Sequence, residues 1–242
     1  RLMFQLFFTP EWFNGFDIIF EGIILVVALM IASYSYKVYK FSGENKFIYF
    51  SLAFVSIGLG LLFKMFTHSV LYFSSLREVT AGVLMPITGG AVSFANILYR
   101  GAFFAEMFLI LAAWLLIFFI SQKSRDRLKK YHEVSQMALF VYLIFLVSFV
   151  ANFQYVVFYL TSAVILSMTV LNYYKNYLNK NKNKNTFLVM VGFLFILASN
   201  IFFIFVFLYS GLYVVGEVFL LIGFLILLLT YRKIRKRARI YE

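Results

Sequence analysis

The chain has 242 residues, of which 63% are hydrophobic and 13% are charged. A soluble domain of this size could not bury so much apolar surface, so the composition excludes an ordinary water-soluble protein. The chain has no cysteine, which excludes disulfides, cysteine nucleophiles and metal sites built on cysteine.

Seven apolar segments are each long enough to cross the roughly 30 Å hydrocarbon core of a bilayer as a helix. Because lipid cannot satisfy an exposed backbone amide, a spanning segment of this kind must be helical. We therefore predict an all-α polytopic membrane protein with a single seven-helix transmembrane domain over residues 1–242, located in the cell membrane. The predicted helices cover residues 16–36, 47–72, 102–121, 134–151, 155–173, 186–209 and 212–231.

Basic residues are concentrated in alternate connections between the predicted helices. Most of the 22 Lys and Arg residues lie between helices 1 and 2, between 3 and 4, between 5 and 6, and in the tail 232–242. The positive-inside rule then puts the N-terminus outside and the C-terminus in the cytoplasm. The expected partners of these inner basic segments are anionic lipid head groups. The net charge of +12 therefore needs no nucleic-acid partner.

The first three predicted helices and their loops match the last three in order. The matched segments are 34–40 with 172–178, 53–66 with 192–205, and 105–118 with 216–229. The last of these matches aligns Glu106 with Glu217. We predict two parallel three-helix repeats, about 13–121 and about 155–231, joined by a linker helix at 134–151 that returns the chain across the membrane.

The first repeat is longer than the second by an insertion around residues 74–101. This stretch is apolar but contains Pro86 and several glycines. The pattern favours a re-entrant or surface-lying hairpin, which could act as a lid. A packed loop that closes the outer end of the bundle explains it equally well.

Ionisable residues in apolar helices are costly, so they are the first candidates for a functional site. There are six candidates for ion or ligand binding: Asp17, Glu21, Lys64, His68, Glu106 and Glu217. Helical spacing puts Asp17 and Glu21 on one face, as it does Lys64 and His68, and all six fall near the outer end. Repeat symmetry would bring Glu106 opposite Glu217. We therefore predict an outward-facing acidic pocket with Lys64 as its internal counter-ion.

A structural role is an alternative explanation for the same acids. Each could lie at head-group level, pair with Lys64, Arg77 or Arg100, or accept hydrogen bonds at a helix N-terminus. The two histidines, His68 and His132, are predicted on opposite sides of the membrane. No metal site and no cofactor is therefore predicted.

Two runs of sequence carry a resemblance to known proteins. FTPEWFNGFD and the helix end YSYKVYKFSG resemble uncharacterised seven-helix membrane proteins of archaea, a resemblance that implies a fold but no activity. The three-plus-one-plus-three plan also resembles the SWEET sugar transporters. Those proteins have hinge prolines within their repeats, whereas Pro10 and Pro86 both lie outside the predicted helices here. Microbial rhodopsins have a similar orientation, but residues 212–231 contain no lysine for retinal.

No nucleotide-binding or hydrolase motif is present, so we do not expect an enzyme. The leading expectation is a membrane protein that binds an ion or small ligand at the acidic pocket. It would act as a sensor or receptor, or as an accessory subunit, with a second copy or a membrane complex as its partner. The alternative is a small-solute transporter with its pathway between the two halves. The inner halves of the helices carry few polar groups, which favours binding over transport.

Overall fold

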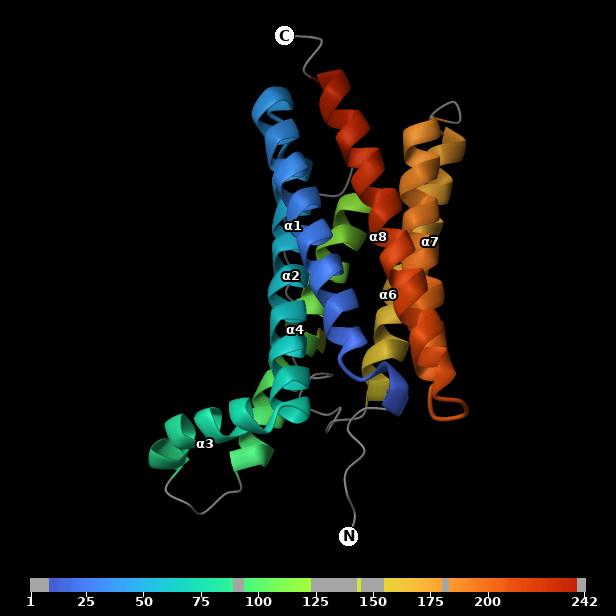
Figure 1. Ribbon diagram of the computed structural model, residues 1–242. Helices are drawn as coiled ribbons and strands as arrows, with labels where there is room; N and C mark the ends of the chain where they lie inside the picture. Colours follow the sequence, from blue (N-terminus) through green and yellow to red (C-terminus); the bar gives the residue numbers. More distant parts are fainter. Residues whose placement is uncertain (1–8, 89–93, 123–142, 145–154, 180–182, 239–242) are drawn as a thin grey trace.

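The computed structural model describes residues 9–88, 94–122, 143–144, 155–179 and 183–238 (Figure 1). Every regular element in these ranges is a helix, and six of the helices are long and apolar enough to cross a membrane. The chain is therefore a multi-pass membrane protein. The six long helices are α1 (Phe16–Ser42), α2 (Asn45–Tyr72), α4 (Phe94–Gln122), α6 (Tyr155–Asn179), α7 (Lys184–Ile204) and α8 (Gly211–Ala238).

Most of these helices extend beyond the apolar segments that predicted them. α1 continues to Ser42 and α8 to Ala238, because helical hydrogen bonding does not stop where the hydrocarbon core ends. α7 is the exception. It ends at Ile204, so the predicted end at residue 209 is wrong. The chain reverses direction before α8 with tight turns, such as the Leu208 amide donating to the Phe205 carbonyl, and hydropathy does not detect such turns in an apolar run.

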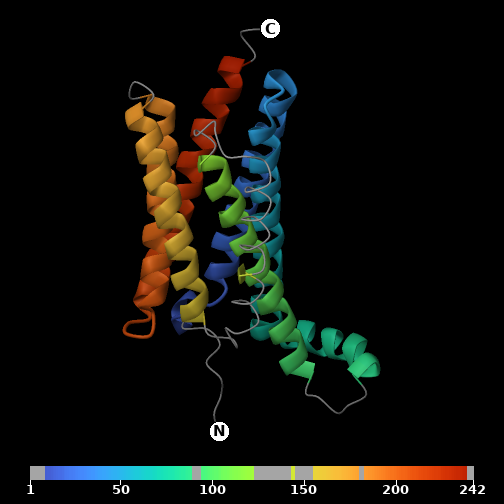
Figure 2. The same ribbon diagram turned by 180° about the vertical axis from the view of Figure 1, so that it is seen from behind.

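The predicted linker helix at 134–151 lies outside the described residues, apart from Leu143 and Ile144, which are helical. The described ranges contain seven α-helices. Six of them correspond to predicted helices, and the seventh was not predicted. The additional helix is α3 (Ser74–Thr88), which projects sideways from the bundle where α2 ends and α4 begins (Figures 1 and 2).

The prediction that Pro86 lies outside a helix is wrong, because Pro86 belongs to the last turn of α3. A proline lacks the backbone N–H that a helix interior needs, and α3 ends soon after it. The sequence suggested a hairpin or a loop because glycines and a proline interrupt this stretch. The glycines and the proline did not prevent the formation of a helix over Ser74–Thr88.

The long helices pack in a ring. α1 contacts α2, and α2 contacts α4, which together form the first triplet; α6 contacts α7, and α7 contacts α8, which form the second triplet. The triplets meet where α1 contacts α8 and where α4 contacts α6. Aromatic side chains fill the space between them, with the Phe54 and Phe224 rings edge to face at 5.8 Å.

Small residues allow close contact within each triplet. A Cβ atom at Gly60 would lie 2.8 Å from the Ile110 side chain, so α2 and α4 approach closely there. A Cβ at Gly223 would lie 2.8 Å from the carbonyl oxygen of Gly192, where α7 meets α8.

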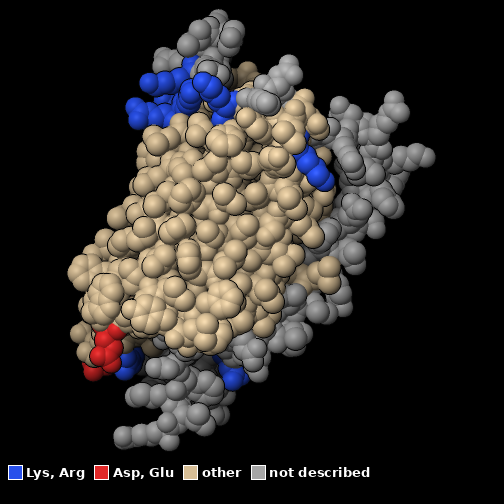
Figure 3. All heavy atoms as spheres, turned by 90° about the vertical axis from the view of Figure 1, so that its right-hand side faces the viewer, with Lys and Arg blue, Asp and Glu red and all other residues tan. Residues whose placement is uncertain are grey.

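The two ends of the bundle differ in charge. We call the end with the α1–α2 turn and the C-terminal part of α8 the basic end, because Lys and Arg side chains gather there (Figure 3). The opposite end, where α1 begins and α3 projects, is the α3 end. The candidate site residues belong to the α3 half of their helices.

Candidate functional site

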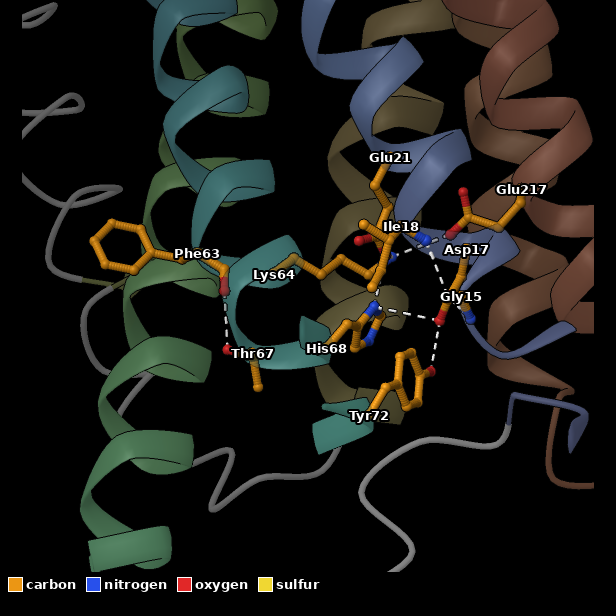
Figure 4. A network of polar contacts seen from close by, with 10 residues as sticks. All are labelled: Gly15, Asp17, Ile18, Glu21, Phe63, Lys64, Thr67, His68, Tyr72 and Glu217. Carbon is orange, nitrogen blue, oxygen red and sulfur yellow. Dashed lines mark hydrogen bonds and ion pairs between the residues drawn. The ribbon is translucent and has the colours of Figure 1, made fainter. Parts of the chain in front are cut away.

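Five of the six predicted site residues form one polar network near the α3 end of the bundle (Figure 4). α1, α2 and α8 supply them: Asp17, Glu21, Lys64, His68 and Glu217. Lys64 is 5% exposed and the other four are fully buried. Spacing of about one helical turn places two members of the network on each of α1 and α2.

Lys64 is the centre of the network. Its Nζ lies 2.9 Å from Oε1 of Glu21 and 3.1 Å from Oε1 of Glu217. The second contact joins the first triplet to the second. The buried contacts are charge-assisted, so each is stronger than a neutral hydrogen bond.

His68 extends the network toward the α3 end. Its Nδ1 lies 3.1 Å from Oε1 of Glu21 and 3.4 Å from Oδ2 of Asp17. Tyr72 donates a hydrogen bond of 2.6 Å to the same Asp17 oxygen. The sequence interpretation missed Tyr72, although it follows His68 by one turn and therefore shares its face of α2.

Asp17 also caps the start of α1. Its Oδ1 accepts hydrogen bonds of 2.9 Å from the backbone amides of Gly15 and Ile18. Gly15 has a φ of 90°, a conformation that other residues rarely adopt, and this turn brings its amide to the Asp17 side chain. Asp17 thus accepts hydrogen bonds at a helix N-terminus, and Glu21 and Glu217 pair with Lys64, which are contacts that the structural alternative predicts.

Arg77 forms no ion pair with an acid among the residues that the structure describes. Arg77 donates a hydrogen bond of 2.7 Å to the carbonyl of Leu71 at the end of α2. It thus satisfies a carbonyl that the helix itself leaves unpaired.

Aromatic rings of the second triplet complete the surroundings of Lys64. Its Nζ lies 5.9 Å from the ring centre of Phe203 and 5.7 Å from that of Tyr213. Within the described part of the chain, Oε2 of Glu21, Oε2 of Glu217 and the Tyr213 hydroxyl are buried without a hydrogen-bond partner. Each of these three buried atoms could therefore form a further hydrogen bond.

Glu106 is the sixth predicted residue and stands apart from the network. It is 4% exposed, and no described residue forms an ion pair or hydrogen bond with its carboxylate. It lines a cavity of about 40 Å³ together with Lys64, Tyr159 and Asn200. That volume is enough for about two or three water molecules. Lys64 thus contacts Glu217 directly and borders the cavity that Glu106 lines.

A metal centre is not formed by these side chains. In the ranges that the structure describes, no group of three or more His, Asp or Glu residues is arranged to hold a metal ion.

No known protein family, curated protein or solved structure matches this chain. The chemistry of the network and of the Glu106 cavity is therefore the basis for a function.

Proposed function

We propose that this chain is a non-enzymatic protein of the cell membrane that binds protons or a small monovalent cation at the network and at Glu106. It acts as a sensor or receptor, or as an accessory subunit of a membrane complex. One observation carries the proposal. Lys64 forms ion pairs with Glu21 and Glu217, whereas Glu106 is buried beside a water-sized cavity and has no ion-pair partner among the described residues.

The charges of the buried residues do not balance. In the described part of the chain, four carboxylates, one lysine and one histidine are buried. Even with the histidine protonated, the acids would leave two negative charges in excess if all were ionised. An unbalanced charge in a low-dielectric interior is costly, so bound protons or a cation must supply the difference.

The size of the cavity limits the ligand. About 40 Å³ accommodates a few water molecules or a partly hydrated small cation, but not an organic molecule. No group of three or more His, Asp or Glu residues in the described ranges could hold a metal ion, which disfavours a divalent cation. The proton and the monovalent cation are the ligands that fit.

The orientation of the chain determines which side the site senses. The basic end faces the cytoplasm under the positive-inside rule, so the network lies in the outer half of the membrane. Tyr72 is only partly buried and donates to Asp17, which links the network to the α3 end. Protons or cations therefore reach the site from outside.

A duplicated architecture supports this arrangement. The two triplets have the same order of contacts, and each meets the other through its first and third helices. Close approach at Gly60 and at Gly192 occurs between the second and third helices of each triplet. Glu106 and Glu217 occupy matching positions in the proposed repeats, but only Glu217 forms an ion pair with the lysine. This asymmetry leaves one of the two acids available for a ligand.

Infrared difference spectroscopy of the protein in lipid nanodiscs tests the proposal. A pH titration should produce the carbonyl band of a protonated carboxylic acid, and added Na⁺ or K⁺ should change that band if a cation competes. Glu106→Gln should remove the component of the band that comes from Glu106 and lower its total intensity, while Glu78→Gln, at an exposed position on α3, should leave the band intact. A band that is unchanged in Glu106→Gln and shows no cation response would refute the proposal.

A transporter is the second candidate, and one observation favours it. A cavity of about 610 Å³ lies at the basic end and is lined by residues of both triplets, so the inner part of a pathway between the halves is already open. Proteoliposomes distinguish the two functions. A transporter should dissipate an imposed pH gradient, and Glu106→Gln should abolish this, whereas a sensor should leave the gradient unchanged.

A further inference from the structure

The cavity at the basic end, which we call the vestibule, has the dimensions of a small-molecule site. Its volume of about 610 Å³ is typical of pockets that hold organic ligands. Residues from α2, α4, α6, α7 and α8 line it. The sequence predicted few polar groups in the inner half of the bundle. The helix ends that converge at the vestibule add further polar groups to that half.

The described residues that line the vestibule carry no net formal charge. They include one acidic and one basic side chain, Glu44 and Lys46, which form an ion pair with each other. Neither is left to neutralise a charged ligand. The lining therefore favours an uncharged solute.

Asparagine amides provide the hydrogen-bonding groups of the vestibule. Four asparagines line it: Asn45, Asn176, Asn183 and Asn185. An amide side chain presents an acceptor and two donors in one plane. Asn176 uses one donor on the Ser121 carbonyl at 3.0 Å, and Asn183 uses its oxygen on the Asn185 amide at 2.9 Å. The remaining positions offer both donors and acceptors to a ligand.

Aromatic side chains line the vestibule where it meets the core. Phe50 and Tyr231 stack with their ring centres 4.5 Å apart, and Tyr173 stacks on Phe193 at 5.5 Å. Phe50 and Tyr231 are buried, whereas Tyr173 is partly exposed, so the Tyr173 ring provides an apolar surface against which another planar group can pack.

We propose that the vestibule binds an uncharged planar solute whose edge carries neighbouring donors and acceptors, such as a primary amide on a ring or a nucleobase. Asparagine pairs with such an edge through two hydrogen bonds, and the Tyr173 ring stacks on its face. The site uses none of the residues of the Lys64 network, so it stands independently of the proton or cation site. Under the proposed orientation, the solute comes from the cytoplasm.

Equilibrium binding to the protein in nanodiscs tests this site with three probes: adenosine, uridine and nicotinamide. At least one should bind saturably, and nicotinate or adenosine monophosphate should bind no more tightly than its uncharged counterpart. Asn176→Ala and Asn185→Ala should each weaken binding roughly tenfold. Asn179→Ala is the matched control, because Asn179 is exposed at the end of α6 and should leave binding unchanged.

Four results would overturn the inference. The first is no saturable binding of any of the three probes, and the second is tighter binding of the charged analogues, which would indicate an anion site. The third is equal binding of myo-inositol, a polyol without a planar edge, and the fourth is unchanged affinity in both asparagine variants. Thermal unfolding of each variant in the same nanodiscs shows whether it is folded, so a loss of binding can be assigned to the site.

Discussion

The Lys64 network and the vestibule both lie between the two triplets of helices. Each contains a lysine paired with a glutamate, but the environments of the two ion pairs differ. Lys64 and Glu217 are buried, with exposed side-chain fractions of 6% and 0%. Lys46 and Glu44, at the edge of the vestibule, have exposed fractions of 44% and 52%. Water screens the second pair and not the first, so the same two chemical groups should contribute very differently to stability.

Aromatic packing separates the two regions. Phe54 and Phe224 contact each other in the core between the Glu106 cavity and the vestibule, and Phe50 stacks on Tyr231 nearer the basic end. The ion site and the proposed solute site therefore do not communicate through a polar path in the described part of the chain. Transport would require these rings to move, whereas sensing would not.

The largest expected effect comes from removing the buried lysine. Lys64→Met leaves Glu21 and Glu217 buried without a counter-ion, so it should lower the free energy of unfolding by about 3–5 kcal/mol. Lys46→Met, the matched change in the exposed pair, should cost no more than about 1 kcal/mol. Thermal unfolding in a mild detergent measures both.

A second variant keeps this prediction testable if Lys64→Met does not fold. Lys64→Met combined with Glu21→Gln and Glu217→Gln removes the whole charged centre and should recover much of the lost stability, because the stranded carboxylates are gone. Equal unfolding temperatures for Lys64→Met and Lys46→Met would contradict the assigned difference between the two pairs.

The two repeat-related glutamates should also differ. Glu217→Gln removes a charged partner of Lys64 while Glu21 remains, so it should cost about 1.5–3 kcal/mol. Glu106→Gln should change stability by less than about 1 kcal/mol, because Glu106 has no ion pair with a described residue to lose. The same unfolding measurement compares them, and a reversed order would show that Glu106, not Glu217, is the acid that Lys64 holds.

Helical spacing predicted part of the network and could not predict the rest. The one-turn separation of Asp17 from Glu21, and of Lys64 from His68, follows directly from the period of a helix. The choice of Glu217 over Glu106 as the partner of Lys64 depends on the rotation and tilt of α2 and α8, which a single sequence does not encode locally. The sequence interpretation missed Tyr72 because it selected acidic and basic side chains, and a tyrosine is neutral at pH 7.

The vestibule was not predicted because its lining comes from helix ends in five elements. Ser121 and Asn183 lie at the edges of, or outside, the predicted spans, where apolar periodicity carries no information. Each polar residue alone is an ordinary helix-end residue. Only the packing of the two triplets brings them around one cavity.

The smallest predicted effect concerns the contact that connects the network to the α3 end. Tyr72→Phe removes the hydrogen bond of 2.6 Å to Asp17 and should cost about 1 kcal/mol, a modest amount because the ring is partly exposed and Asp17 keeps its two backbone donors. Tyr49→Phe, at an exposed position on the same helix, is the matched control and should have no effect. If protons enter through Tyr72, the same variant should slow the infrared response of Glu106 to a pH jump without removing its band. An unchanged rate would place the route to Glu106 elsewhere and leave Tyr72 with a structural role.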